Sequence, residues 1–147
     1  MPTSTRDSNS FGFEGTTQRA QVGTFFEPSF AVDTTERDLC IVDSAELGAV
    51  NFCMTVKNTG STTIAIDAYV SNDKNHIASA AGWVNLANVY DEADVSVSLP
   101  QNITAGSIEH YIFGYKNQPM LTTFRYWRFT VKTAAGTSTC DMYGNAK

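Results

Sequence analysis

The sequence predicts an all-β protein: a single antiparallel β-sandwich over residues 22–147, jelly-roll or immunoglobulin-like in topology, with an extended N-terminal arm over residues 1–21. Three observations predict this fold. Segments in which apolar and polar residues alternate recur along the chain, which is typical of strands with one buried and one solvated face. Turn-forming residues separate these segments at intervals of roughly 10 to 15 residues, as in antiparallel sandwiches. No long segment shows the period of a helix.

The arm is rich in Thr, Ser, Gly and Gln, and it carries too few apolar residues to fold by itself. Two interpretations are open. It is either a disordered leader or an extended segment that becomes ordered on a neighbouring subunit. In the second case Phe11 and Phe13 are the expected anchors, and Arg6 and Arg19 are the charged contacts beside them.

Three strands are expected in the first half of the domain, and the last two of them form a hairpin. The turn between those two is Asn58-Thr59-Gly60-Ser61, in which Asn and Gly tolerate the positive φ angles that hairpin turns require. A turn is also expected at residues 43–48. The three strands are residues 38–42, 50–57 and 63–71. Alternate residues of the hairpin should face the core: Phe52, Met54, Val56, Ile64, Ile66, Ala68 and Val70.

In the second half the clearest strand is the one in which Trp127, Phe129 and Val131 alternate with polar residues. Residues 87–93 are expected to host one helical turn at most. Residues 103–106 are expected to form a turn. The strands expected in this half are residues 82–86, 95–99, 107–114, 126–132 and 139–143.

The composition bounds the class of protein. A chain of 147 residues forms one domain, and 42% hydrophobic residues is ordinary for a globular protein. Charged residues make up only 17%, which is typical either of β-rich proteins or of surfaces covered by partners. The net charge of −5, without a basic cluster, argues against nucleic acid as the ligand. No apolar run is long enough for a signal peptide or a membrane span, so a soluble protein made in the cytoplasm is expected.

The cysteines are Cys40, Cys53 and Cys140, an odd number that cannot pair completely within the chain. Cys40 and Cys53 lie in apolar runs and are expected to be buried. Three free thiols are the expected state. A disulfide that involves Cys140 is the open alternative.

Residues that could carry catalysis or bind metal are few. His76 and His110 stand at no metal-ligand spacing from each other or from a cysteine or carboxylate. The acidic group Asp91, Glu92 and Asp94 could bind calcium or serve a hydrolase, but it lacks the alternating pattern of calcium loops and is expected to be a solvated loop. Nucleophile and phosphate-loop motifs are missing. We therefore expect no enzymatic activity, no cofactor and no metal.

Aromatic residues are the remaining candidates, because exposed Trp and Tyr form the stacking platforms of carbohydrate-binding sandwiches. Trp83 and Trp127 occupy positions on apolar faces and are expected to lie in the core. The full set of candidates is Tyr69, Trp83, Tyr90, Tyr111, Tyr115, Tyr126, Trp127 and Tyr143.

Several of these elements occur together between residues 50 and 139: Asn58-Thr59-Gly60, a strand that ends in Tyr69-Val70-Ser71, Gly82-Trp83, and the strand over residues 126–132 that leads into Gly136-Thr137. In this combination the chain resembles the small β-sandwich virion accessory proteins of tailed bacteriophages. The resemblance carries no family-specific functional residue.

The resemblance implies a non-enzymatic virion protein, made in the host cytoplasm. It would be a capsid decoration (cement) protein or a neck or tail component. Its implied partners are major capsid or tail subunits and further copies of itself, with no nucleic acid and no membrane. The alternative function is a carbohydrate-binding module that recognises the host surface.

Overall fold

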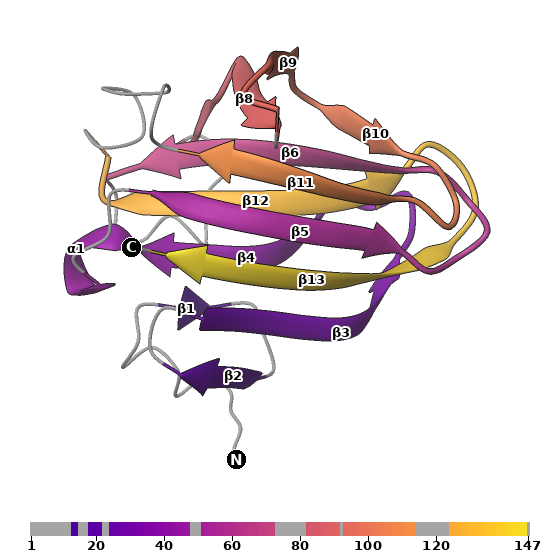
Figure 1. Cartoon of the computed structure of the whole chain (residues 1–147), viewed down its shortest axis with the longest axis horizontal. Coiled ribbons are helices and arrows are strands. Elements are labelled where there is room, and N and C mark those ends of the chain that lie inside the picture. Colours follow the sequence, from indigo (N-terminus) through magenta and orange to yellow (C-terminus); the bar gives the residue numbers. More distant parts are fainter. Residues whose placement is uncertain are drawn as a thin grey trace.

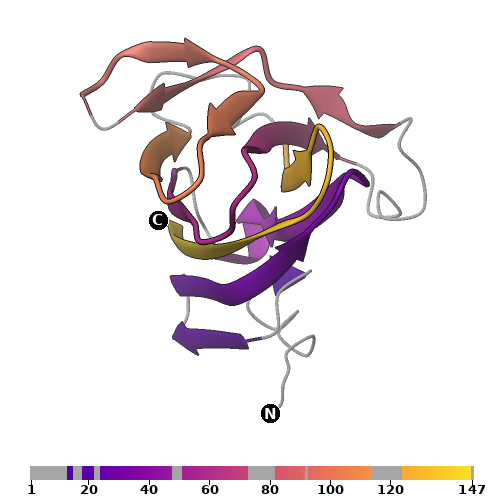
Figure 2. The same cartoon turned by 90° about the vertical axis from the view of Figure 1, so that its right-hand side faces the viewer.

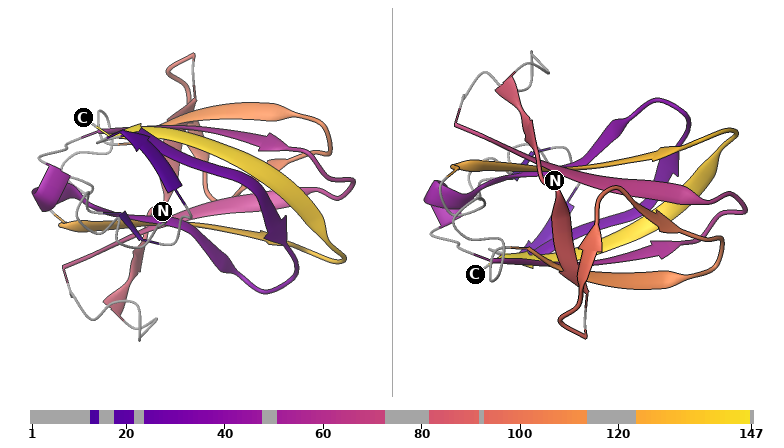
Figure 3. Two further views of the ribbon diagram at one scale, coloured as in Figure 1. Left: turned by 90° about the horizontal axis from the view of Figure 1, so that it is seen from below. Right: turned by 90° about the horizontal axis from the view of Figure 1, so that it is seen from above.

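Two antiparallel sheets pack face to face in the computed structural model, and their edge-on view is clearest in Figure 3. The structure describes residues 13–14, 18–21, 24–47, 51–72, 82–91, 93–113 and 124–146. No helix within these residues is long and apolar enough to cross a membrane. The described elements, in chain order, are β1 (Phe13–Glu14), β2 (Gln18–Gln21), β3 (Thr24–Val32), β4 (Arg37–Asp43), α1 (Ser44–Leu47), β5 (Phe52–Asn58), β6 (Ile64–Ser71), β7 (Val84–Asn85), β8 (Asn88–Asp91), β9 (Ser96–Ser98), β10 (Gln101–Ile103), β11 (Ile108–Phe113), β12 (Tyr126–Thr133) and β13 (Ser138–Ala146).

The strand order decides between the two expected topologies. The 6-stranded sheet runs β1-β4-β12-β6-β10, with β7 also paired to β6, and the 7-stranded sheet runs β2-β3-β13-β5-β11-β8-β9. Strands β3 and β4, β5 and β6, β10 and β11, and β12 and β13 follow each other in the chain but lie in opposite sheets, as Figure 1 shows. This nested order is that of a jelly roll, built from two Greek keys. The prediction of an all-β sandwich is confirmed.

The core lies between the sheets and is formed by the alternate residues of the long strands. The hairpin residues expected there, from Phe52 to Val70, are all at most 1% exposed. Phe52, Phe113 and Phe129 form its aromatic centre, with ring centroids 4.7 Å apart for Phe52–Phe129 and 4.6 Å for Phe113–Phe129. Burying each of these rings contributes roughly 1.5–3 kcal/mol to folding, and they join the two sheets because Phe52 and Phe113 come from one sheet and Phe129 from the other.

One end of the sandwich is closed by the buried amide of Asn58. Its Nδ2 donates to the carbonyls of Thr62 (2.8 Å) and Ile103 (2.9 Å), and its Oδ1 accepts from the Gly60 nitrogen (3.1 Å) and the Ser138 hydroxyl (2.9 Å). A Cβ at Gly60 would collide with the Ser138 side chain. The predicted turn thus needs its glycine for space.

Strands β1 and β2 lie within the segment expected to be an arm. Phe13 of β1 pairs with Val42 of β4, and Gln18 of β2 pairs with Phe26 of β3, so each sheet gains a strand at the same side of the sandwich (lower part of Figure 1). In these stretches the leader therefore pairs with its own domain. Its role as an arm towards a neighbouring subunit stays a prediction.

The sequence missed β3, β8 and β10, and it missed the helical character of α1, where a turn was expected. The alternation in β3 is broken by a bulge in which Pro28 and Ser29 stand opposite the single residue Asp141. The carboxylate of Asp141 accepts a hydrogen bond from the Ser29 nitrogen at 2.8 Å, and Ser29 has a φ of 52°. The bulge keeps β3 in its sheet despite a proline, because it removes those two residues from the regular ladder.

Candidate functional site

Of the four predicted contact residues, the structure describes the backbone of two, so the prediction that they contact a neighbouring subunit stays a prediction. Phe11 and Arg6 lie outside the described residues. The backbones of Phe13 and Arg19 are placed in β1 and β2, which pair with opposite sheets.

The polar residues considered for catalysis or metal binding have ordinary structural partners. The His110 ring nitrogen Nδ1 shares a 2.8 Å hydrogen bond with the Thr55 hydroxyl on an exposed strand pair. The Asp91 carboxylate accepts the nitrogens of Ala93 (2.9 Å) and Val95 (3.0 Å), so it shapes the turn between β8 and β9. Among the described residues no three His, Cys, Asp or Glu side chains are grouped to hold a metal ion. His76 and Glu92 lie outside the described residues.

All three thiols are free, but they differ in exposure. Cys40 and Cys140 are buried, as expected for Cys40. Burial, followed by the charge of nearby carboxylates, raises the pKa of the Cys140 thiol to about 12 and that of Cys40 well above its ordinary value. The expectation that Cys53 is buried is wrong, because Cys53 lies between two core residues of β5 and points to the outer face of the sheet.

The outer face of the 6-stranded sheet carries a connected group of polar and aromatic side chains, which we call the Arg128 cluster. At its centre the Arg128 guanidinium lies over the rings of Tyr69 and Trp83, 5.2 and 5.5 Å from their centroids, and its Nε donates to Asp38. The cluster consists of Glu36, Asp38, Asp67, Tyr69, Trp83, Asn85, Arg128 and Thr130.

Strand register explains how distant residues meet in the cluster. Arg128 of β12 is directly opposite Tyr69 of β6, which in turn is opposite Asn85 of β7. Directly opposed residues point to the same side of a sheet. Trp83 comes just before β7 and is partly exposed. The prediction that Trp83 belongs to the core is therefore wrong, whereas Trp127 is fully buried as expected.

Hydrogen bonds inside the cluster fix its carboxylates. Glu36 accepts from the hydroxyls of Tyr69 (2.7 Å) and Thr130 (2.6 Å), and the Asn85 amide donates to Asp67 at 2.9 Å. Partial burial alone would raise the pKa of Glu36, but the two hydroxyl donors and the nearby positive charges outweigh it and lower that pKa. The pKa of Tyr69 is raised, chiefly by burial and by its hydrogen bond to Glu36, so the phenol remains a donor.

The outer face of the 7-stranded sheet is different. Phe26 and Tyr143 stack there with ring centroids 4.8 Å apart, and Ile108 and Tyr143 are 50% and 46% exposed. Cross-strand pairing places these residues on the same side as Cys53 and Ile112. We call this surface the Tyr143 face, defined by Phe26, Cys53, Ile108, Ile112 and Tyr143.

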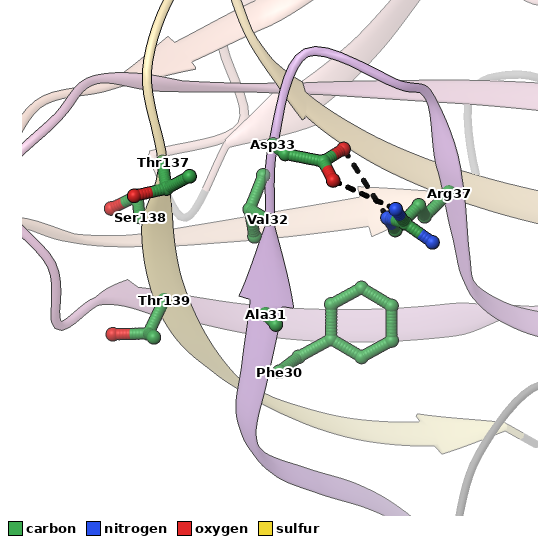
Figure 4. Close-up of a pocket in the computed structure, with 8 residues that line it drawn as sticks. All are labelled: Phe30, Ala31, Val32, Asp33, Arg37, Thr137, Ser138 and Thr139. Carbon is green, nitrogen blue, oxygen red and sulfur yellow. Dashed lines mark hydrogen bonds and ion pairs between the residues drawn. The ribbon is translucent and has the colours of Figure 1, made fainter.

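A third feature is an open depression of about 600 Å³ where the chain passes from β3 to β4 (Figure 4). The Phe30 ring lies at one side, and Asp33 and Arg37 form an exposed ion pair at 2.7 Å above it. The paired charges neutralise each other, so the depression offers little electrostatic attraction for an ion. Its lining residues are Phe30, Ala31, Val32, Asp33, Arg37, Thr137, Ser138 and Thr139.

No protein-family model and no curated protein matches the sequence. Solved structures with a similar shape include the SPBc2 prophage-derived protein YomS, with a TM-score of 0.48 and 12% identity over 84% of this chain and 93% of that one. PirA matches with a TM-score of 0.46 and 11% identity over 88% of this chain and 98% of that one. The CBM22-1–GH10 modules of Clostridium thermocellum xylanase 10B, complexed with xylohexaose, match with a TM-score of 0.36 and 12% identity over 93% of this chain and 26% of that one. At these values the matches decide neither family nor function.

Proposed function

We propose that this protein is a non-enzymatic structural protein of a tailed-phage virion, a capsid decoration protein that binds neighbouring subunits through the Tyr143 face and the N-terminal leader. The observation that carries the proposal is the set of exposed aromatic and aliphatic side chains on the Tyr143 face. A sheet face that meets only water normally presents polar side chains. Here stacked aromatic rings and two isoleucines point outwards among the polar residues Thr55, His110 and Asn145.

The chemistry of this face resembles the centre of a protein interface. Interface centres are rich in aromatic and aliphatic residues and poor in charge. On the paired outer rows of β5, β11 and β13 the acidic and basic residues Asp141 and Lys57 stand opposite each other at one end, and Thr55, His110 and Asn145 are the polar residues between the apolar ones. A partner that covers these rows would bury mainly uncharged surface, which favours stable association.

The leader supplies a second means of contact. Strands β1 and β2 form short ladders with β4 and β3, and a leader from another copy could make the same backbone hydrogen bonds. Many copies on a particle would then add avidity to modest individual contacts. A neck or tail position is the alternative within the same function.

Solution mass, measured by light scattering, tests association. The full chain is expected to form oligomers. A chain that starts at Val22 and a Tyr143→Glu variant are each expected to shift towards monomers, with circular dichroism as the control for folding. A full chain that stays monomeric over the whole concentration range would overturn self-association through these surfaces.

Particle composition tests the virion role. Particles of the phage that encodes this protein can be purified, and their proteins can be quantified by mass spectrometry. This protein is expected at a fixed ratio to the most abundant shell protein. If it occurs instead at a fixed ratio to tail proteins, it is a tail component, and its absence from purified particles would overturn the proposal.

A further inference from the structure

Strand β9 (Ser96–Ser98) forms one end of the 7-stranded sheet, on the side of the molecule opposite the leader strand β2 (upper part of Figure 1). Within the described part of the chain it pairs with β8 on one side and with no strand on the other. Sheet ends that meet solvent usually carry charged side chains or proline, because a bare edge can pair with another chain. The five residues from Val95 to Leu99 contain neither.

The backbone of this segment has hydrogen-bonding groups that point away from the sheet. The Val95 carbonyl accepts and the Leu99 nitrogen donates a 3.1 Å hydrogen bond towards the β8 arm of the hairpin. In an antiparallel ladder such residues alternate with residues whose N–H and C=O groups point the other way, so Ser96 and Ser98 direct theirs to the outer edge. The Ser98 carbonyl also accepts from the Gln101 side chain at 2.5 Å, and its second lone pair remains as an acceptor.

The apolar side chains of the same segment are incompletely covered. Val97 and Leu99 pack against the core but remain partly exposed. Val95 points to the same side of the strand, because it is two residues from Val97, and it is 54% exposed. A further strand on this edge would place its own side chains beside this apolar row, since directly opposed residues point to the same side of a sheet.

We propose that β9 is a dimerisation edge, on which the β9 strand of a second copy pairs antiparallel about a twofold axis at Val97. In this register Ser96 is opposite Ser98 of the second copy, and each such pair exchanges two backbone hydrogen bonds. Val97 is opposite Val97 of the second copy. The exposed Val95 is opposite Leu99 of the second copy, so apolar side chains cover one another along the whole segment.

The segment is complementary to itself, which selects a second copy as the occupant. Its ends limit the register, because Asp94 has a φ of 64° and Pro100 has no N–H group. The register centred on Val97 is the one in which residues 95–99 of both copies overlap completely. The acidic turns before Val95 then lie at opposite ends of the pair, roughly 20 Å apart at about 3.3 Å per residue. At that separation salt screens their mutual repulsion.

Such a dimer is independent of the virion role, because β9 is not part of the Tyr143 face or the leader. It would join two 7-stranded sheets into one. The Tyr143 faces of both copies would then lie on the same side of the joined sheet, since antiparallel pairing keeps outward residues outward.

Analytical ultracentrifugation of the full-length Tyr143→Glu chain tests β9 apart from the Tyr143 face. This chain is expected to show a monomer–dimer equilibrium. Adding Ser98→Pro removes an N–H group that points outwards and leaves the ladder with β8 intact, so the dissociation constant should rise at least about tenfold. Adding Ser98→Ala instead keeps the N–H group and should leave the dissociation constant unchanged. Circular dichroism and the thermal midpoint check that each variant folds.

Two further variants test the edge without a proline. Val95→Lys changes an exposed side chain, and its charge is expected to weaken the dimer with an unchanged thermal midpoint. Val97→Cys, made together with Cys53→Ser so that the two native thiols left are buried, is expected to give a disulfide-linked dimer on mild oxidation.

The proposal is overturned if the Tyr143→Glu chain stays monomeric at every concentration, or if Val95→Lys dimerises as tightly as its parent. A dimer that depends on Val95 but gives no cross-link through Val97→Cys would show that another strand, such as the leader, occupies the edge, and would overturn the pairing with a second β9. If the Tyr143→Glu chain has the same mass as the wild type, the contact through the Tyr143 face fails and the β9 dimer stands.

Discussion

The two outer faces of the sandwich share the same pleated geometry but present different kinds of side chain to the solvent. On the 6-stranded sheet Arg128 donates to Asp38 and lies over the rings of Tyr69 and Trp83, and Glu36 accepts from the Tyr69 hydroxyl. On the 7-stranded sheet Phe26 and Tyr143 stack on each other, and the isoleucines Ile108 and Ile112 lie on β11, with β5 between β11 and β13. The first face is held together by its own polar contacts, and the second leaves aromatic and aliphatic side chains exposed.

The difference shows that outward position alone says little about function. In both sheets strict alternation decides which residues face away from the core. Which of these outward-facing residues contact each other depends on which strands become neighbours in the sheet. Tyr69 and Arg128 interact because β6 lies beside β12, and Phe26 meets Tyr143 because β3 lies beside β13.

The largest expected effect is a difference in reactivity between the three thiols. It tests whether Cys53, and with it the Tyr143 face, points to the solvent. Cys53 is exposed, whereas Cys40 and Cys140 are fully buried. A disulfide reagent such as Ellman's reagent is expected to react rapidly with one thiol per chain in native protein and with all three after denaturation. Two rapid equivalents, or none, would contradict the assignment. The Cys53→Ser variant serves as the control and should lose the rapid phase.

Matched truncations compare how much each face contributes to stability. Arg128→Ala leaves Asp38 without its ion pair and removes the packing over Tyr69 and Trp83, so the free energy of unfolding should fall by about 2 kcal/mol. Tyr143→Ala removes a side chain that is 46% exposed, and a loss below about 1 kcal/mol is expected. Urea unfolding at neutral pH measures both. Equal losses in the free energy of unfolding would mean that the side-chain contacts on the two faces contribute equally to stability.

The fold could be predicted because its signals are local. The hairpin residues from Phe52 to Val70 alternate as a half-buried pair of strands requires, and the structure buries the apolar ones. Alternation also placed Cys53 on the outer side, and the apolar character of its neighbours wrongly suggested burial. The strand β3 was missed since Pro28 and the bulge at Ser29 interrupt its pattern.

The candidate sites could not be predicted because they depend on register between strands far apart in the sequence. Trp83 stands in an apolar run, and only the pairing of β7 with β6 brings it to Arg128 on the outer face. The jelly-roll order itself follows from which strands pair, a choice that alternation leaves open. Composition was informative only in general terms, because the low charge content suits both a β-rich chain and a covered surface.

A charge introduced on the Tyr143 face tests which of the two outer faces takes part in self-association. Tyr143→Glu places a carboxylate where a partner would bury it, and the dissociation constant of self-association should rise at least about tenfold, equal to about 1.4 kcal/mol. Analytical ultracentrifugation measures the change. The matched variant Asn85→Glu adds the same charge to the opposite face and should leave the mass unchanged. If both variants dissociate the protein equally, the Tyr143 face is not the contact.

The smallest expected effect concerns the pH dependence of the Arg128 cluster. The pKa of Glu36 is lowered from its ordinary value of 4.5, as the hydrogen bonds from Thr130 and Tyr69 outweigh the effect of burial. A carboxyl group with a lowered pKa binds its proton less well in the folded state than in the unfolded state. Its stabilising contribution is therefore complete above the unfolded pKa and is lost as the pH falls through the folded pKa.

Glu36→Gln keeps the shape and one acceptor oxygen but cannot titrate. The variant is expected to be slightly less stable than the wild type at neutral pH, with the difference shrinking as the pH falls below 4.5. Urea midpoints measured across this range for both proteins give the difference directly. Asp141→Asn provides a comparison on the other sheet, where the carboxylate accepts a hydrogen bond from the Ser29 nitrogen at 2.8 Å. A difference between wild type and Glu36→Gln that does not change with pH would show that the cluster does not depend on the ionised carboxylate.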